Sequence, residues 1–205
     1  MLKISTSNSK MGNIQSISFP PGETCISNAP CLKSCYARKI TCRFSTVKEA
    51  WQENLALYKH DPDDFFKSLK IWLIENHCRR FRWHVGGDIP DEYYLNHMNL
   101  TATLFPEIQF LCFTKRHDWI LNFRERIPDN LVIVLSTWPG MEIPPPVFPR
   151  SWLISSAKRI TQPGLKDYLG KLPKEYFKCT GGCETCGYCW ELAKIGTVDV
   201  AFHIH

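Results

Sequence analysis

The chain has 205 residues, 44% of them hydrophobic and 22% charged, with a formal net charge of +5 at pH 7, which is typical of one globular domain over residues 1–205. The charge permits an attraction to nucleic acid without requiring it. Since no run of about 18 apolar residues and no signal peptide stand out, we expect a cytoplasmic protein without a membrane span, whose ten cysteines are not paired as structural disulfides.

The first third of the chain predicts one strand, a cysteine-bearing loop and two helices. LKIST (2–6) has the pattern of a short strand, and a loop with Gly, Pro and Ser follows it. Thr46 and Glu49 form a capping-box pattern at the start of a helix. Asp61 and Pro62 begin a second helix that continues to about His77.

The rest of the chain alternates between strand and helix patterns. Strands are expected at 81–90, 108–115, 131–137, 151–157 and 197–205, and helices at about 91–104, 117–127 and 166–173. LVIVLST (131–137) is a continuous apolar strand, which is typical of a parallel sheet covered on both faces. No helix pattern lies between Thr137 and Ser151.

This order of elements predicts an α/β fold with a mostly parallel sheet. The architecture we expect is a small or partial (β/α) barrel with a cysteine-rich N-terminal loop and a cysteine-rich C-terminal tail. Loops at the carboxyl ends of parallel strands carry function in such folds. Both cysteine groups therefore become candidates for a functional site.

The tail, CTGGCETCGYCW (179–190), spaces four cysteines as C-x3-C-x2-C-x2-C. A zinc ribbon uses two separate knuckles, whereas the bacterial ferredoxin run packs successive thiolates around an iron–sulfur cube. The spacing therefore favours an iron–sulfur centre over zinc. The candidate ligands are Cys179, Cys183, Cys186 and Cys189.

The N-terminal loop, CISNAPCLKSCYARK (25–39), supplies three more candidate ligands, Cys25, Cys31 and Cys35. Three thiolates are one short of a fully ligated cube, so one iron would stay open or Cys42 would supply the fourth ligand. Cys78 and Cys112 are expected to be small buried residues instead. Two arrangements stay open: each cysteine group binds its own [4Fe-4S] cluster, or the two groups share one.

Three cysteines after the first strand, the last followed by Tyr36, resemble the radical S-adenosylmethionine fold. That resemblance implies a [4Fe-4S] cube at these cysteines with S-adenosylmethionine on its open iron. It also implies that Gly86, Gly87 and Asp88, similar to the GGE motif of that superfamily, bind the cofactor. The cysteine spacing here is C-x5-C-x3-C, longer than the usual C-x3-C-x2-C.

More narrowly, CISNAPCLKSCYA together with CETCGYCW near the end resembles the phage "Gene product 88" domain family. The resemblance spans most of the chain, and it implies a phage or prophage protein in the host cytoplasm. The activity of that family is poorly defined, so the resemblance implies no substrate.

Several other residues have both a functional and a structural interpretation. Asp88 either faces the site or caps the helix that begins near Pro90. His84, in an apolar strand, is expected to be a hydrogen-bonded core histidine. Polar groups at strand ends are expected to face a presumed cavity; these are Lys115, Arg116, His117, Ser136, Thr137, Ser155 and Ser156. The basic, aromatic stretches 78–84 and 115–119 can mark a nucleic-acid surface.

Three functional hypotheses follow. The first is an iron–sulfur protein whose cluster is redox-active, sensing or structural, with a host protein, nucleic acid or small-molecule cofactor as partner. The second is a radical S-adenosylmethionine-type enzyme. The third is a zinc-stabilised nucleic-acid-binding module.

Overall fold

The computed structural model describes residues 1–154, 164–192 and 198–203, which form a mixed α/β fold around one seven-stranded parallel sheet. The strand order is β1-β2-β3-β4-β5-β7-β6. Over the described residues β1 and β6 are the two edges, so the sheet is not closed. The strands are β1 (Gln15–Ile17), β2 (Arg80–Trp83), β3 (Gln109–Thr114), β4 (Leu131–Ser136), β5 (Arg150–Ile154), β6 (Phe177–Lys178) and β7 (Val200–His203).

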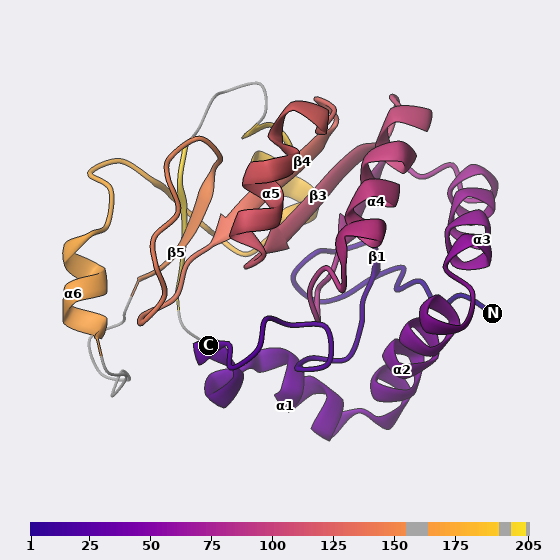
Figure 1. Cartoon of the computed structure of the whole chain (residues 1–205), viewed down its shortest axis with the longest axis horizontal. Coiled ribbons are helices and arrows are strands. Elements are labelled where there is room, and N and C mark those ends of the chain that lie inside the picture. Colours follow the sequence, from indigo (N-terminus) through magenta and orange to yellow (C-terminus); the bar gives the residue numbers. More distant parts are fainter. Residues whose placement is uncertain (155–163, 193–197, 204–205) are drawn as a thin grey trace.

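Most helices lie between consecutive strands, as parallel connections require (Figure 1). The α-helices are α1 (Tyr36–Arg43), α2 (Ser45–His60), α3 (Pro62–Glu75), α4 (Glu92–Leu104), α5 (His117–Phe123), α6 (Leu165–Gly170) and α7 (Cys183–Cys186). Short 3-10 helices are η1 (Pro30–Ser34), η2 (Arg124–Arg126) and η3 (Tyr188–Trp190). No helix in the described part of the chain has the length and apolar character needed to cross a membrane.

The larger core lies on the face of the sheet that α2, α3, α4 and α5 cover, which we call the outer face. Phe81 and Trp83 of β2 pack with alternate residues of β3 and β4 against the apolar faces of α2, α3, α4 and α5. The alternation arises because successive strand residues point to opposite faces. Aromatic rings dominate this core, and Tyr94 of α4 lies within 5.9 Å of the rings of Phe19, Tyr58, Phe65, Phe66 and Trp83.

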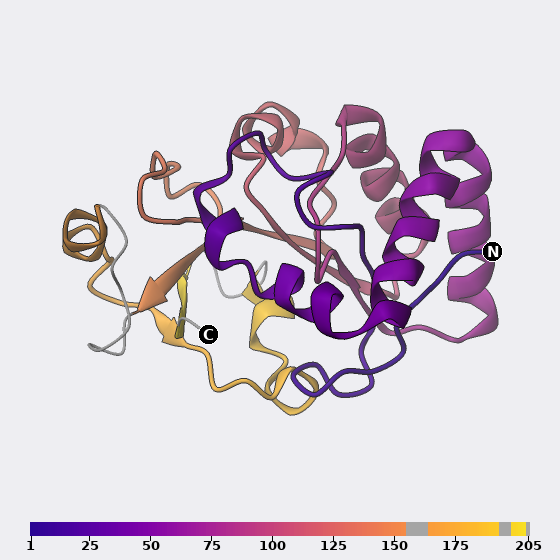
Figure 2. The same ribbon diagram turned by 90° about the horizontal axis from the view of Figure 1, so that it is seen from below.

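The opposite face, which we call the inner face, is covered by the N-terminal loop and the cysteine-rich tail instead of long helices. Met11 and Ile14 from the N-terminal loop and Trp190 from the tail pack on Leu111 and Val132 of the central strands. In Figure 2, α4 and α5 lie on one side of the sheet, and the tail lies on the other side beside the N-terminal loop. The Cys183 amide donates to the Lys10 carbonyl (3.0 Å) and joins these two segments.

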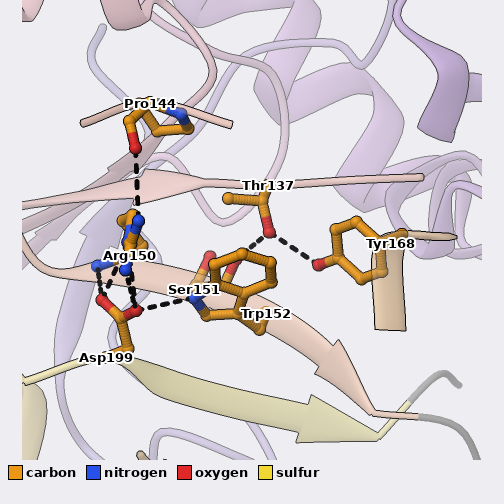
Figure 3. A network of polar contacts seen from close by, with 7 residues as sticks. All are labelled: Thr137, Pro144, Arg150, Ser151, Trp152, Tyr168 and Asp199. Carbon is orange, nitrogen blue, oxygen red and sulfur yellow. Dashed lines mark hydrogen bonds and ion pairs between the residues drawn. The ribbon is translucent and has the colours of Figure 1, made fainter. Parts of the chain in front are cut away.

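A polar network joins β5 to β7 (Figure 3). Asp199 accepts hydrogen bonds from the Arg150 guanidinium (2.8 Å to Nη2) and from Trp152 Nε1 (2.8 Å). Thr137, directly after β4, donates to the Ser151 carbonyl (2.8 Å) and contacts the Tyr168 hydroxyl (2.6 Å). These contacts fasten β4, β5 and β7 where no helix connects β4 to β5, as the sequence predicted.

Most predicted elements are confirmed, with several corrections. The strand predicted at 81–90 is limited to Arg80–Trp83, and α1 and α7 were not expected. The first strand lies at 15–17 and not at 2–6, where Ser5 forms only a single bridge with Ser16. The predicted capping box at Thr46 is wrong, because α2 already begins at Ser45 and its N-cap, Phe44, has no side-chain hydrogen bond. The tail strand β6 was not expected. The Asp61 cap of α3 is confirmed by a bond from the Asp64 amide (2.9 Å).

Candidate functional site

The first cysteine group lies in the loop that follows β1, at the carboxyl end of the strand. Cys25, Cys31 and Cys35 are all partly buried free thiols, and Cys35 directly precedes α1. The Gly22 amide donates to the Cys25 sulfur (3.3 Å). Burial raises the pKa of the Cys25 and Cys31 thiols, and the ammonium of Lys115 acts in the opposite direction on both. A cation therefore lies near these two sulfur atoms.

Hydrogen bonds hold this loop to the ends of the neighbouring strands. Thr24 is the centre of the attachment: its hydroxyl accepts from the Asp88 amide (2.9 Å), and its carbonyl accepts from Arg116 Nη2 (2.8 Å). The Tyr36 hydroxyl donates to the Val85 carbonyl. The three thiols are thus fixed beside the carboxyl ends of β2 and β3.

Gly86 and Gly87 form the closest approach between the loop and β2. A Cβ on Gly87, whose φ is +77°, would lie 2.7 Å from the Thr24 hydroxyl, and a Cβ on Gly86 would overlap the Trp51 ring. The Gly86 carbonyl accepts from the Phe19 amide (3.1 Å). Packing alone therefore requires glycine at both positions, and the bare backbone lines the cavity described below.

Asp88 is buried and its carboxylate is already engaged by the protein. One oxygen accepts from the Thr114 hydroxyl (2.6 Å) and the Ile89 amide (2.8 Å), and the other accepts from the Lys115 amide (3.0 Å). The predicted helix-capping alternative is wrong for this residue. It is Asp91 that caps α4, accepting from the Tyr94 amide (2.8 Å).

A cavity of about 710 Å³ opens between the loop, α1 and the carboxyl half of the inner face. All three thiols of the loop line it, together with Gly86, Gly87 and Asp88. Strand-end groups complete the wall, as the sequence predicted for several of them: Lys115, Ser136, Thr137, Ser151 and His203. The volume is in the range of small-molecule sites. Ser155, Ser156 and His205 lie outside the described residues.

The four tail cysteines form a second group on the inner face, away from the cavity lining. Cys179, Cys183 and Cys189 pack against its apolar residues, and Cys186 is exposed. The Cys179 amide donates to the Ala201 carbonyl (2.9 Å). Burial, together with the neighbouring thiols, raises the pKa of Cys189 to about 12, while Arg82 acts in the opposite direction. The four sulfurs therefore belong to one electrostatic group.

The two groups lie on the same face, and Lys10 and Arg82, which line the cavity, both act electrostatically on Cys183 of the tail. The loop group lies at the carboxyl ends of the strands, whereas Trp190 beside the tail group stacks on Arg80 at the amino end of β2 (5.9 Å). Among the described residues, which include all ten cysteines, no three His, Cys, Asp or Glu side chains converge on a single metal ion. Cys42 is exposed on α1, and Cys78 and Cys112 are buried as predicted.

Sequence reasoning missed three residues that line the cavity. These are Ser16 of β1, Arg82 of β2 and Trp138 after β4, each with a buried polar atom that has no hydrogen-bond partner in the described structure. For Arg82 a signal existed: in RFRW the two arginines alternate with two aromatic residues, which places both arginines on one face of the strand. His84 is buried as predicted, but neither ring nitrogen is hydrogen-bonded.

The protein is therefore an α/β protein with an open parallel sheet and a cysteine-lined cavity at the carboxyl ends of its strands. Comparison with protein families narrows the class, because the model of the Gene product 88 family matches residues 2–141, more than half of the chain. The chain belongs to the Gene product 88 family, a family of phage gene products. The match includes the loop cysteines and Gly86–Asp88 but not the tail cysteines. Searches of curated proteins and of solved structures found no match.

Proposed function

We propose that the protein is an iron–sulfur protein, in which Cys25, Cys31 and Cys35 hold a [4Fe-4S] cluster and leave one iron facing the cavity. One observation carries the proposal: three free thiols from a single loop line the same small-molecule-sized cavity. When bound, such a cluster supplies one-electron chemistry and an open coordination position next to a ligand. The open position distinguishes this site from a purely structural centre.

The spacing of the thiols supports a cluster more than a single zinc ion. A tetrahedral zinc with bonds of about 2.3 Å needs its thiolates within roughly 4 Å of one another. A cube offers a separate iron to each thiolate, so it accepts ligands that are further apart. The tail run C-x3-C-x2-C-x2-C lacks the two separate knuckles of a zinc ribbon, so the zinc-stabilised nucleic-acid module has less support.

The surrounding residues have defined roles in this proposal. Thr24 and Asp88 keep the loop in place through the bond between the Asp88 amide and the Thr24 hydroxyl. Lys115, whose charge favours the thiolate form of Cys25 and Cys31, offsets the negative charge that ligation brings. Gly86 and Gly87 contribute bare backbone to the cavity wall, while Trp51 and Thr24 fill the space beside them.

We further propose that the tail group holds a second centre with four thiolate ligands, Cys179, Cys183, Cys186 and Cys189. None of its cysteines lines the cavity, and its surroundings are apolar, which supports an electron-carrying or structural role. Burial and hydrogen bonding around a cluster set its reduction potential. A redox-sensing version would act on a host protein or nucleic acid in the host cytoplasm.

Reductive activation of S-adenosylmethionine is the second candidate function. The specific observation in its favour is that Gly86 and Gly87 line the same cavity as the three loop thiols, in an open parallel sheet. This is the arrangement that the resemblance to radical S-adenosylmethionine enzymes implies. Asp88 would then act through its backbone and neighbours, because its carboxylate accepts three hydrogen bonds within the protein.

The test is anaerobic purification followed by iron and sulfide analysis and electron paramagnetic resonance of the reduced protein. We expect a cubane signal whose loop-cluster component is lost in the Cys25→Ala/Cys31→Ala/Cys35→Ala variant, while the component from the tail centre remains. Cys42→Ala is the matched control, because Cys42 is exposed and does not line the cavity. Loss of iron in Cys42→Ala would show a fourth thiolate and exclude the open iron. A signal changed by S-adenosylmethionine would support the enzyme.

A further inference from the structure

The inner wall of the cavity presents hydrogen-bond donors that have no acceptor. Ser16 and Arg82 are paired in register across β1 and β2, so their side chains share one face of the sheet and lie in neighbouring strands. Both line the cavity. The Ser16 hydroxyl and Arg82 Nε are buried, and neither has a hydrogen-bond partner in the described structure. Buried polar groups are normally satisfied, so this pair requires an explanation.

Arg82 forms no ion pair with a carboxylate in the described part of the chain, although its charge favours the thiolate form of Cys183 and Cys189 in the tail. Its Nη1 reaches only the Met11 sulfur (3.5 Å), a weak acceptor, and its guanidinium stacks on the Phe113 ring at 4.8 Å. Arg150, by contrast, forms an ion pair with Asp199, with 2.8 Å between Nη2 and Oδ2. Stacking fixes the plane of the Arg82 guanidinium and leaves its edge available to a planar or tetrahedral anion.

Further donors line the same cavity, beside apolar residues, the three thiols and His84, whose ring nitrogens also have no partner in the described structure. Trp138 contributes an indole N–H without a partner, and Lys10 and Lys115 contribute ammonium groups. Arginine, lysine and tryptophan side chains can only donate hydrogen bonds. Asp88 is the acidic residue in this wall, and its oxygens already accept three bonds from the protein. The complement of this wall is therefore a molecule that accepts hydrogen bonds and carries negative charge.

We propose that Arg82 and Ser16 bind the carboxylate or phosphate group of a small, partly apolar substrate in this cavity. The apolar part of the molecule would lie against Phe113, Trp138 and Phe202, which line the same space. The substrate role rests on the proposed function, because the loop cluster would supply the chemistry. Anion binding itself does not require the cluster, so the two ideas fail separately.

The experiment measures binding of benzoate, phenyl phosphate and neutral benzamide to the full chain by isothermal titration calorimetry, with iron and sulfide counted in each preparation. We expect at least one anion to bind ten-fold or more tightly than benzamide. Arg82→Gln should weaken that binding ten-fold or more, Ser16→Ala by a few-fold, and Arg82→Lys should recover part of the loss. Arg80→Gln is the matched control, from the same strand and face but outside the cavity.

Equal binding of benzamide and the anions by the wild-type chain would overturn the proposal without any variant. The proposal would also be overturned if Arg82→Gln weakened probe binding no more than Arg80→Gln does. It would be overturned as well if Arg82→Gln changed only the spectrum of the tail centre and left probe binding unchanged. Anion binding by a preparation without iron would support this inference while contradicting the iron–sulfur proposal. Loss of probe binding in saturating S-adenosylmethionine would assign the anion site to that cofactor and overturn the substrate role.

Discussion

At the scale of single residues, Asp88 has a role that its sequence motif did not reveal. Its carboxylate joins the end of β2 to the end of β3 through Thr114 and Lys115, while its amide holds the cysteine loop through Thr24. A motif predicts that a residue lies at a site, but only the surrounding hydrogen bonds determine whether its side chain is available. Asp88 positions the site instead of facing a ligand.

Asp88→Asn should therefore destabilise the fold. The side-chain NH2 of asparagine is a donor, and it would face either the Lys115 N–H or the two donors at the other oxygen. At least one buried hydrogen bond is therefore lost, at a cost of about 1–3 kcal/mol. Urea unfolding monitored by circular dichroism measures this change. Asp129→Asn, at an exposed turn, should stay within about 0.5 kcal/mol of wild type. Equal midpoints for the two variants would contradict the positioning role.

His84 predicts how stability depends on pH. Burial, with a contribution from Arg82, lowers its pKa from 6.5 to about 3 in the folded protein. Below about pH 6.5 the unfolded chain therefore binds a proton that the folded chain does not. Stability should decrease as the pH falls from about 6.5 toward 3, by an amount on the order of a few kcal/mol at about 1.4 kcal/mol per pKa unit.

The pH prediction is checked by urea midpoints at several pH values for wild type and His84→Asn. Asparagine suits this position because φ of His84 is +57°, a region that asparagine tolerates. The variant should lose part of the slope between pH 6.5 and 4 even if it is less stable throughout. His60→Asn, an exposed histidine on α2, should keep the full slope. An unchanged slope in His84→Asn would exclude His84 as the source.

The candidate site could be predicted from sequence only where spacing alone carries the signal. The cysteines of both groups stand out because closely spaced thiols are good ligands for one metal centre. Ser16 and Arg82 do not stand out, since their importance depends on the pairing of β1 with β2 and on missing acceptors around them. A missing hydrogen-bond acceptor depends on how the chain packs, so the sequence alone does not reveal it.

At the scale of elements, long periodic segments were predictable and short paired strands were not. α3 has a proline start, an aspartate cap and an apolar face, so local chemistry determines its boundaries. β6 has only two residues, Phe177 and Lys178, and exists because it pairs with Val200 and Ala201 of β7. β1 was missed for the same reason: its three residues are defined by their pairing with Phe81–Trp83.

The contact between β5 and β7 depends on one buried ion pair. Asp199 accepts from the Arg150 backbone and guanidinium and from Trp152 Nε1. Asp199→Ala should cost about 3–5 kcal/mol, because it leaves the Arg150 charge buried without a partner. Thermal unfolding measures the loss. The Lys3–Glu53 pair is the control: both side chains are about half exposed, at 45% and 54%, so Glu53→Ala should cost at most about 1 kcal/mol.

At the scale of the whole molecule, the sheet places the two cysteine groups on the same side. The outer face is filled by helices and large aromatic residues, so both groups have to lie on the inner face or at its rim. The loop group is held at the carboxyl ends of β2 and β3, and the tail group is held by bonds to Lys10 and to β7. This arrangement favours two centres over one shared centre.

Two centres predict additive loss of iron. Wild type, purified anaerobically, should contain about eight irons per chain if each group holds a cube. Replacing the three loop cysteines with alanine should remove about four and abolish any change that a cavity ligand makes in the paramagnetic resonance signal. Replacing Cys179, Cys183, Cys186 and Cys189 should remove the other four and leave that change intact. If the groups shared one cluster, either variant would lose all iron, which colorimetric iron analysis would detect directly.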